Sequence, residues 1–158
     1  MYFRTGDILR RDSDGYFYFA DRVGDTFRWK SENVSTAEVS EVLSVYPDCI
    51  EVNIYGVQIP GHDGRAGMAA IVAKNSMDWN KFAEFALKNL PRYSVPIFIR
   101  KVPEVEITGT FKQRKVELVK EGMDPSTIKD ELLWLDGHLY KPFGADEYQR
   151  VVSGKAKL

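Results

Sequence analysis

Residues 50–59, IEVNIYGVQI, are followed by the turn-forming residues 60–64, PGHDG, and by the apolar run 67–73, GMAAIVA. Apolar side chains alternate in the first run, which is typical of a half-buried strand, and the second run has the apolar continuity of a buried strand. The sequence therefore predicts a β-hairpin. Residues 61–67 are not a phosphate-binding P-loop, because they lack the Gly-Lys-Ser/Thr ending and join two strands.

Helical patterns lie on both sides of this hairpin. Ser35 and Glu38 stand at the separation of a capping box, and apolar residues follow at helical spacing until Pro47. Asp78 can cap a second helix that ends at Pro91. Two further helices are predicted, from about residue 113 to 121 and from residue 146 to 152.

Shorter strands complete the pattern. Residues 8–11 and 16–19 predict a hairpin about Asp14-Gly15, and residues 132–135 and 138–140 predict another about Asp136-Gly137. Residues 97–99 are a short strand, and residues 21–33 are expected to be a polar loop. Strand pairs interrupted by helices predict an α+β domain with helices packed on a small sheet.

Composition excludes several classes of protein. The 158 residues suit one ordinary domain, and 22 Lys and Arg against 23 Asp and Glu leave no positive field for nucleic acid. Cys49 is the only cysteine, and with His62 and His138 it cannot build a disulfide framework or a zinc site. The sequence has no apolar run of the roughly 18 residues that a membrane span needs, and we expect a soluble chain in a reducing compartment.

Three places carry residues that suit chemistry. Asp7, directly after Gly6, could accept both hydroxyls of a ribose, although turns often contain Gly-Asp. Arg22 could bind phosphate, and Gly24, two residues later, could be a hinge. An ordinary solvated charged loop would show the same sequence pattern. Lys112 ends a Thr/Gly turn just before a helix and could stabilise moving negative charge, although most lysines are simply exposed.

The order and spacing of these signals resemble the C-terminal domain of adenylate-forming enzymes, in particular the very-long-chain acyl-CoA synthetase and fatty-acid transport protein group. The stretches that carry the resemblance are residues 2–7, 14–19, 67–71 and 108–112, Leu90-Pro91-Arg92-Tyr93 with Pro96, and FADRVGDTFRWKSENV at 19–34. The resemblance implies a lid domain with a small mixed sheet, preceded by a β-hairpin connector. Residues 1–23 would end the N-terminal domain and form the connector, and residues 24–158 would form the lid. The abrupt opening suggests a piece excised from a longer enzyme.

The resemblance also implies roles for the residues named above. Asp7 and Arg22 would bind ATP and AMP, Gly24 would be the hinge, and Lys112 would be the catalytic lysine of adenylation. The loop that would line the CoA tunnel consists of Phe27, Arg28, Trp29, Lys30 and Ser31. No metal-binding residue is expected here. ATP, CoA and Mg²⁺ would serve the full-length enzyme, with fatty acid as the other substrate, and none of the three would be bound by this region alone.

Two positions depart from the pattern of the superfamily. Gly24 stands where many members carry a charged hinge residue, and it frees the backbone but removes a side-chain lock. Ser31 stands where many relatives have glycine, so that its Cβ could crowd the tunnel. These departures bear on the thioester step more than on the role of Lys112.

Two other classes of function are open at this point. The region could be a non-catalytic module that binds a protein or a lipid surface through residues 27–30 and its exposed hairpins, or a free-standing nucleotide-binding protein. Ala156-Lys157-Leu158 resembles a variant of the Ser-Lys-Leu address read by the peroxisomal import receptor, although a basic tail could end this way by chance. We therefore expect a peroxisomal enzyme, and any association with a membrane would come from its N-terminal region.

Overall fold

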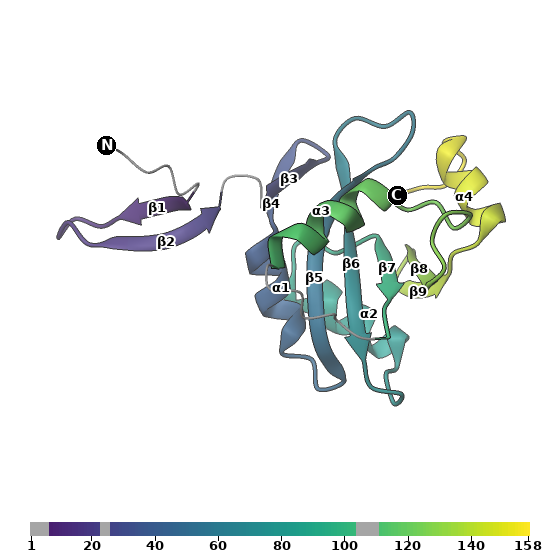
Figure 1. Ribbon diagram of the computed structural model, residues 1–158, viewed down its shortest axis with the longest axis horizontal. Helices are drawn as coiled ribbons and strands as arrows, with labels where there is room; N and C mark the ends of the chain where they lie inside the picture. The colour runs from purple at the N-terminus through teal and green to yellow at the C-terminus, as the bar shows by residue number, and fades with distance from the viewer. Residues whose placement is uncertain (1–6, 23–25, 104–110) are drawn as a thin grey trace.

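The computed structural model describes residues 7–22, 26–103 and 111–158, and the side chains of residues 9–18, 26–103 and 115–158. The strands are β1 (Asp7–Arg11), β2 (Phe17–Arg22), β3 (Thr26–Trp29), β4 (Glu32–Ser35), β5 (Cys49–Gln58), β6 (Arg65–Ala73), β7 (Phe98–Lys101), β8 (Glu131–Asp136) and β9 (Leu139–Pro142). The helices are α1 (Thr36–Ser44), α2 (Trp79–Asn89), α3 (Phe111–Glu121) and α4 (Ala145–Val152). Figure 1 shows β1 and β2 outside the layers formed by the main sheet and its helices.

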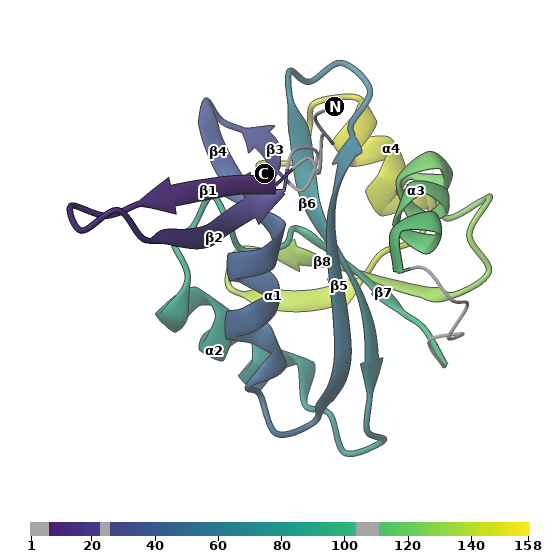
Figure 2. The ribbon, with the colours of Figure 1, turned by 60° about the vertical axis from the view of Figure 1, so that its left-hand side comes forward.

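The main sheet has five strands in the order β5-β6-β7-β8-β9. The β6–β7 pair is parallel and the other three pairs are antiparallel, so the sheet is mixed. Helix α2 forms the crossover that a parallel pair requires. Figure 2 shows α1 and α2 on one side of the sheet and α3 and α4 on the other. The predicted α+β class, with helices packed on a small mixed sheet, is confirmed.

Helix starts follow the capping chemistry of the sequence. Asp78 Oδ1 accepts hydrogen bonds from the backbone N–H groups of Asn80 (3.0 Å) and Lys81 (3.1 Å). Ser35 Oγ accepts one from the N–H of Glu38 at 3.4 Å. Each cap satisfies donors that the first helical turn leaves without partners. The apolar faces of these helices meet the sheet in a core whose largest fully buried side chains include Tyr55, Phe82 and Phe98.

The predicted hairpin turns are confirmed, with Gly15 at φ 91° and Gly137 at φ 68°. The prediction of a polar loop over residues 21–33 was wrong, because residues 26–35 form the β3–β4 hairpin. Its two-residue turn is Lys30-Ser31, with φ of 49° and 68°. A turn with two positive φ values normally uses Asn-Gly or a similar pair, so the sequence lacks the usual hairpin signal.

Candidate functional site

The β1–β2 hairpin places two predicted nucleotide-binding residues opposite each other. Asp7 opens β1 and Arg22 closes β2, and the two are Cα partners in the antiparallel register. Their side chains, and Gly24 as a whole, lie outside the described residues. Nucleotide binding and the hinge therefore stay predictions, but the two backbone positions that would meet ATP are adjacent in space.

The same hairpin exposes apolar side chains. Leu9, Tyr16, Phe17 and Tyr18 are between 48% and 68% exposed. Exposed apolar patches of this kind mark surfaces that another part of a protein covers. This is consistent with the predicted connector position.

The β3–β4 hairpin is anchored by its aromatic residues. Phe27 is 6% exposed and Trp29 is 4% exposed. Phe27 lies against Gly56 and Gly67, which are cross-strand partners in β5 and β6. A Cβ on Gly56 would stand 2.6 Å from the Cβ of Phe27, so only glycine permits this contact. Sequence analysis missed the packing of Phe27 against these two glycines, because the three residues come from different strands.

A second close approach holds the backbone of β3. Gly64, in the loop between β5 and β6, has φ +77°, and a Cβ there would lie 2.4 Å from the carbonyl oxygen of Arg28. The loop between β5 and β6 therefore contacts the backbone of β3. With Phe27 and Trp29 buried, the surface of the predicted CoA loop consists of Arg28, Lys30 and Ser31, which are exposed.

The turn of this hairpin contacts the last residue of the sequence. Lys30 Nζ donates to the carbonyl oxygen of Leu158 and lies 6.0 Å from the centroid of the Trp29 ring. Ala156 is 9% exposed and its backbone N–H donates to the carbonyl of Arg150. The predicted address at residues 156–158 thus packs on the domain, and the peroxisomal location stays a prediction.

Helix α3 carries Lys112 as its second residue, and the side chain of Lys112 lies outside the described residues. One turn later, Lys115 Nζ donates to Thr36 Oγ1 at 2.9 Å. At the other end of the helix, Arg100 pairs with Glu121 and its Nε donates to Asp130 Oδ2 at 2.7 Å. Polar contacts therefore hold α3 near both ends.

One buried and one half-buried group complete the polar chemistry of the sheet. Tyr55, on β5, has a buried hydroxyl that forms no hydrogen bond with the residues that the structure describes, and burial raises its pKa above the ordinary value. Burial, with a smaller contribution from Glu51, raises the pKa of the Cys49 thiol to about 11. Because a thiolate is the reactive form, Cys49 is not an activated nucleophile.

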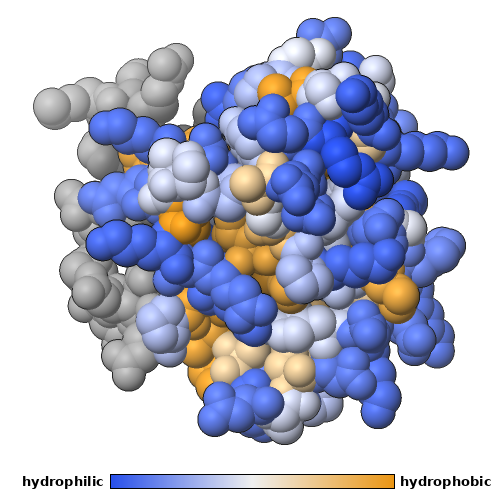
Figure 3. Space-filling view, turned by 90° about the vertical axis from the view of Figure 1, so that its right-hand side faces the viewer, coloured by the Kyte–Doolittle hydropathy of each residue, from blue (hydrophilic) through white to orange (hydrophobic). Residues whose placement is uncertain are grey.

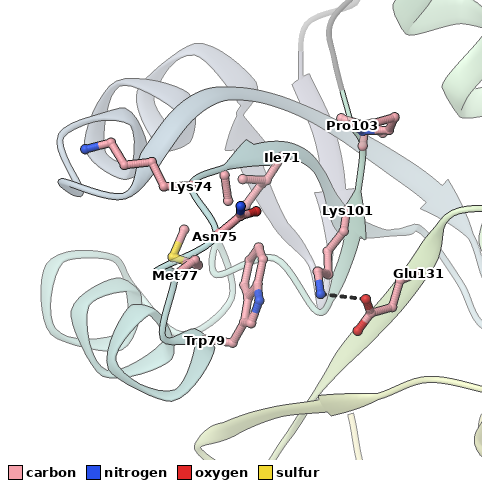
Figure 4. Close-up of a pocket in the computed structure, with 10 residues that line it drawn as sticks. Ile71, Lys74, Asn75, Met77, Trp79, Lys101, Pro103 and Glu131 are labelled. Atoms are coloured by element: carbon pink, nitrogen blue, oxygen red, sulfur yellow. Dashed lines mark hydrogen bonds and ion pairs between the residues drawn. The ribbon is translucent and has the colours of Figure 1, made fainter.

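A pocket of about 490 Å³ opens at the ends of β6 and β7 (Figure 4). In it Lys101 Nζ pairs with Glu131 at 2.6 Å and lies 5.6 Å from the centroid of the Trp79 ring. The lining residues are Ile71, Ala73, Lys74, Asn75, Met77, Trp79, Lys101, Val102, Pro103 and Glu131. None of the predicted site residues whose side chains the structure describes lines this pocket.

Two negative findings concern only residues 7–22, 26–103 and 111–158. No three His, Cys, Asp or Glu residues among them gather as metal ligands. No helix among them is long and apolar enough to cross a membrane. Figure 3, seen from the side of α4, shows hydrophilic residues over most of that face, with hydrophobic residues between them near its centre.

No family model matches this chain. Curated sequences match it along all or nearly all of its own length. The chain is 46% identical to long-chain fatty acid transport protein 2 of Rattus norvegicus and 43% identical to a very long-chain fatty acid transport protein of Cochliobolus heterostrophus, in each case over 100% of the chain and 26% of the relative. It is 48% identical to isopenicillin N epimerase component 1 of Hapsidospora chrysogena over 94% of the chain and 26% of the relative. The chain thus spans about a quarter of the length of the relatives it matches.

A solved structure supports the same relationship. The fatty acyl CoA synthetase of Mycobacterium tuberculosis is 27% identical with a TM-score of 0.58, over 75% of this chain and 24% of that one. In full-length homologues this region accompanies an N-terminal adenylation domain. The chain therefore belongs to the fatty acid transport protein and very-long-chain acyl-CoA synthetase family of the adenylate-forming superfamily, and it corresponds to the C-terminal region of those proteins.

Proposed function

We propose that the full-length protein is an AMP-forming fatty acid CoA ligase and that residues 24–158 are its lid. The observation that carries this proposal is the position of Lys112 in the first turn of α3, in a chain that matches fatty acid transport proteins along its whole length. A first helical turn favours anions, because the helix dipole is positive there. This is the position in which a lysine could meet a carboxylate and a phosphate.

In the first half-reaction, a carboxylate oxygen of the fatty acid attacks the α-phosphorus of ATP and pyrophosphate leaves. Lys112 would stabilise the negative charge that moves from the carboxylate to the phosphate oxygens. Asp7 and Arg22 would hold the ribose and phosphate of the nucleotide, which their opposite positions in the β1–β2 register support. The described residues offer no cluster that fits Mg²⁺, so no step is assigned to that ion.

In the second half-reaction, the sulfur of CoA attacks the acyl carbonyl and AMP leaves. The domain would turn about Gly24, withdraw Lys112 and present the β3–β4 hairpin. Arg28, Lys30 and Ser31 are the exposed residues of the predicted tunnel loop, while Phe27 and Trp29 would act from the core by fixing its shape. Rotation of one domain allows two transition states to be stabilised in turn at one site.

Substitution of Lys112 in the full-length protein tests the proposal. Lys112→Ala is expected to slow pyrophosphate release from fatty acid and ATP by roughly 10²–10³-fold, and to leave thioester formation from preformed acyl-AMP nearly unchanged. Lys120→Ala, at an exposed position of the same helix, is the matched control and should change neither rate. Equal losses in both steps for Lys112→Ala would refute the assignment.

The nucleotide site has its own test. Asp7→Ala in the full-length protein is expected to weaken ATP binding, measured by calorimetry, because one acceptor for the ribose hydroxyls is lost. An unchanged affinity would count against ribose binding. The acid substrate must be tested separately, with pyrophosphate release from fatty acids of graded length, because a relative with 48% identity carries the name of an epimerase component.

The binding-module alternative is weakened by burial. Phe27 and Trp29, which would supply the apolar contacts of residues 27–30, are in the core, whereas the exposed apolar side chains of the β1–β2 hairpin still favour the hairpin part of this alternative. The third hypothesis, a free-standing nucleotide-binding protein, predicts tight binding of ATP, AMP or CoA by the 158-residue chain in isolation. The lid proposal predicts no tight binding, because the rest of the site would lie in the N-terminal domain.

A further inference from the structure

A hydrogen bond joins two helices that lie on opposite sides of the main sheet. Lys115 is on α3 and Thr36 is the first residue of α1, and Figure 2 shows these helices on either side of β5. The Nζ–Oγ1 distance is 2.9 Å, and the donor is an ammonium group, so the bond is charge-assisted. Thr36 is only 6% exposed, which shields the acceptor from water.

This bond orders a side chain that is usually mobile. A lysine loses rotamer freedom when it is held in one geometry, so the contact must outweigh that entropic cost. Lys115 is partly buried, whereas Lys120 on the same helix is exposed. The contact therefore restrains the N-terminal half of α3.

The contact lies close enough to Lys112 to affect the position of its backbone. Positions 112 and 115 are one helical turn apart, roughly 4.5 Å along the axis. Arg100 holds the other end of the helix through Glu121, the last residue of α3. Two attachments, one near each end, fix both the tilt and the rotation of the helix, and so the backbone from which Lys112 projects.

Thr36 is also tied directly to the β3–β4 hairpin. Ser35 is the last residue of β4 and Thr36 opens α1, so no linker separates the acceptor from the hairpin. The Lys115 contact thus sets the position of α3 with respect to β4, as well as with respect to the sheet.

We propose that Lys115 is a positioning residue for adenylation: its bond to Thr36 fixes α3, and with it Lys112, relative to the rest of the lid. The inference rests on the proposed function, in which Lys112 assists only the first half-reaction. Misplacement of a reacting group by about 1 Å can lower a rate by roughly 10²-fold. Loss of the bond should therefore slow adenylation selectively.

The experiment uses the full-length protein and measures two rates for each variant. Lys115→Met is expected to slow pyrophosphate release from fatty acid and ATP by roughly 10-fold, within the range that a misplaced group produces. Thioester formation from preformed acyl-AMP and CoA should stay within about 2-fold, since a step that does not use Lys112 requires no positioning of α3. Lys115→Arg, which can still donate to Thr36, should restore most of the first rate.

Two further variants separate positioning from folding. Thr36→Val removes the acceptor with little change of shape and should slow only adenylation. If Lys115→Met does not fold, both rates can still be measured for Thr36→Val. Lys120→Met is the matched loss of a lysine and should leave both rates unchanged. The inference is overturned if Thr36→Val leaves adenylation unchanged, or if both rates fall together in a folded variant.

The result for Lys112→Ala distinguishes failure of the positioning role of Lys115 from failure of the proposed function. If that variant loses adenylation selectively and the Lys115 and Thr36 variants do not, the positioning role is wrong and the proposed function stands. If Lys112→Ala itself shows no selective loss, the proposed function fails and the positioning role fails with it.

Discussion

The β3–β4 hairpin and helix α3 both bury apolar side chains against the same core, but polar contacts have a larger share in the attachment of α3. The hairpin inserts Phe27 and Trp29 into the core and rests on glycines of β5 and β6. Helix α3 buries Leu118 but exposes 63% of Val116, and its attachments also include the Lys115–Thr36 bond and the Arg100–Glu121 pair. Apolar fit is a large and nearly salt-independent contribution, whereas single polar contacts contribute about 1 kcal/mol each. The hairpin should therefore be rigid, and the position of α3 should depend on a few individual contacts.

Truncation of the buried hairpin aromatic should have the largest effect. Phe27→Ala is expected to lower the free energy of unfolding of the 158-residue chain by about 3–5 kcal/mol, because it removes a ring from a site that cannot collapse. Val116→Ala on α3 should change it by less than about 0.5 kcal/mol. Urea denaturation of both variants measures the difference, and similar values would show that the two regions are not anchored differently.

The steric contribution of the close contact between Gly64 and β3 can be separated from the contribution of backbone strain by comparing two glycines of one loop. Gly64→Ala should destabilise the chain by about 3 kcal/mol, since it adds a clash with the Arg28 carbonyl to an unfavourable positive φ. Gly61→Ala, in the same loop with φ +78° and nothing within 4 Å of the added Cβ, should show only the backbone penalty of about 1 kcal/mol. Thermal unfolding provides the comparison; equal penalties would mean that the loop does not support β3.

The polar attachment of α3 should be weaker and local. Glu121→Gln removes the negative charge that pairs with Arg100 and leaves at most a hydrogen bond to a neutral amide oxygen, so it should lower the local stability of α3 by about 1–2 kcal/mol. Hydrogen exchange is expected to speed up for the amides of α3 and to stay unchanged for those of β3. Glu117→Gln, at an exposed position of α3, is the control. Faster exchange in β3 would contradict the separation of the two regions.

The smallest effect should be a gain of stability at the hairpin turn. Ser31→Gly removes the strain of a non-glycine residue at φ 68° and is expected to stabilise the chain by about 1 kcal/mol. Ser153→Gly, where φ is −79°, should be neutral or slightly destabilising because glycine gains freedom in the unfolded state. A loss of stability in Ser31→Gly would show that the serine makes a contact worth more than the strain.

Much of the fold followed from local signals. Asp78 before an amphipathic run, and glycine at positions 15 and 137, predicted a helix and two hairpins that are confirmed. The β3–β4 hairpin was missed because Lys30-Ser31 is an unusual pair for its turn. The alternation of Thr26-Phe27-Arg28-Trp29 was the signal that could have revealed it.

The candidate site depends on contacts that sequence spacing does not encode. Thr36 and Lys115 are 79 residues apart, and neither stands in a pattern that would pair them. The residues around the pocket at Trp79 come from several elements and gave no signal either. For Lys112 the sequence predicted the start of the helix, whereas the attachment of that helix required the three-dimensional arrangement.

The direct succession of Ser35 and Thr36 has a kinetic consequence. Under the proposed function, the β3–β4 hairpin and Lys112 belong to one domain that cannot present both to the reaction at once, so the fractions of time spent in the two proposed orientations add to one. Under the proposed function, a small molecule that binds at the turn at Lys30 would hold the domain in one orientation. It would inhibit the half-reaction that needs the other orientation without contacting the reactants of that half-reaction.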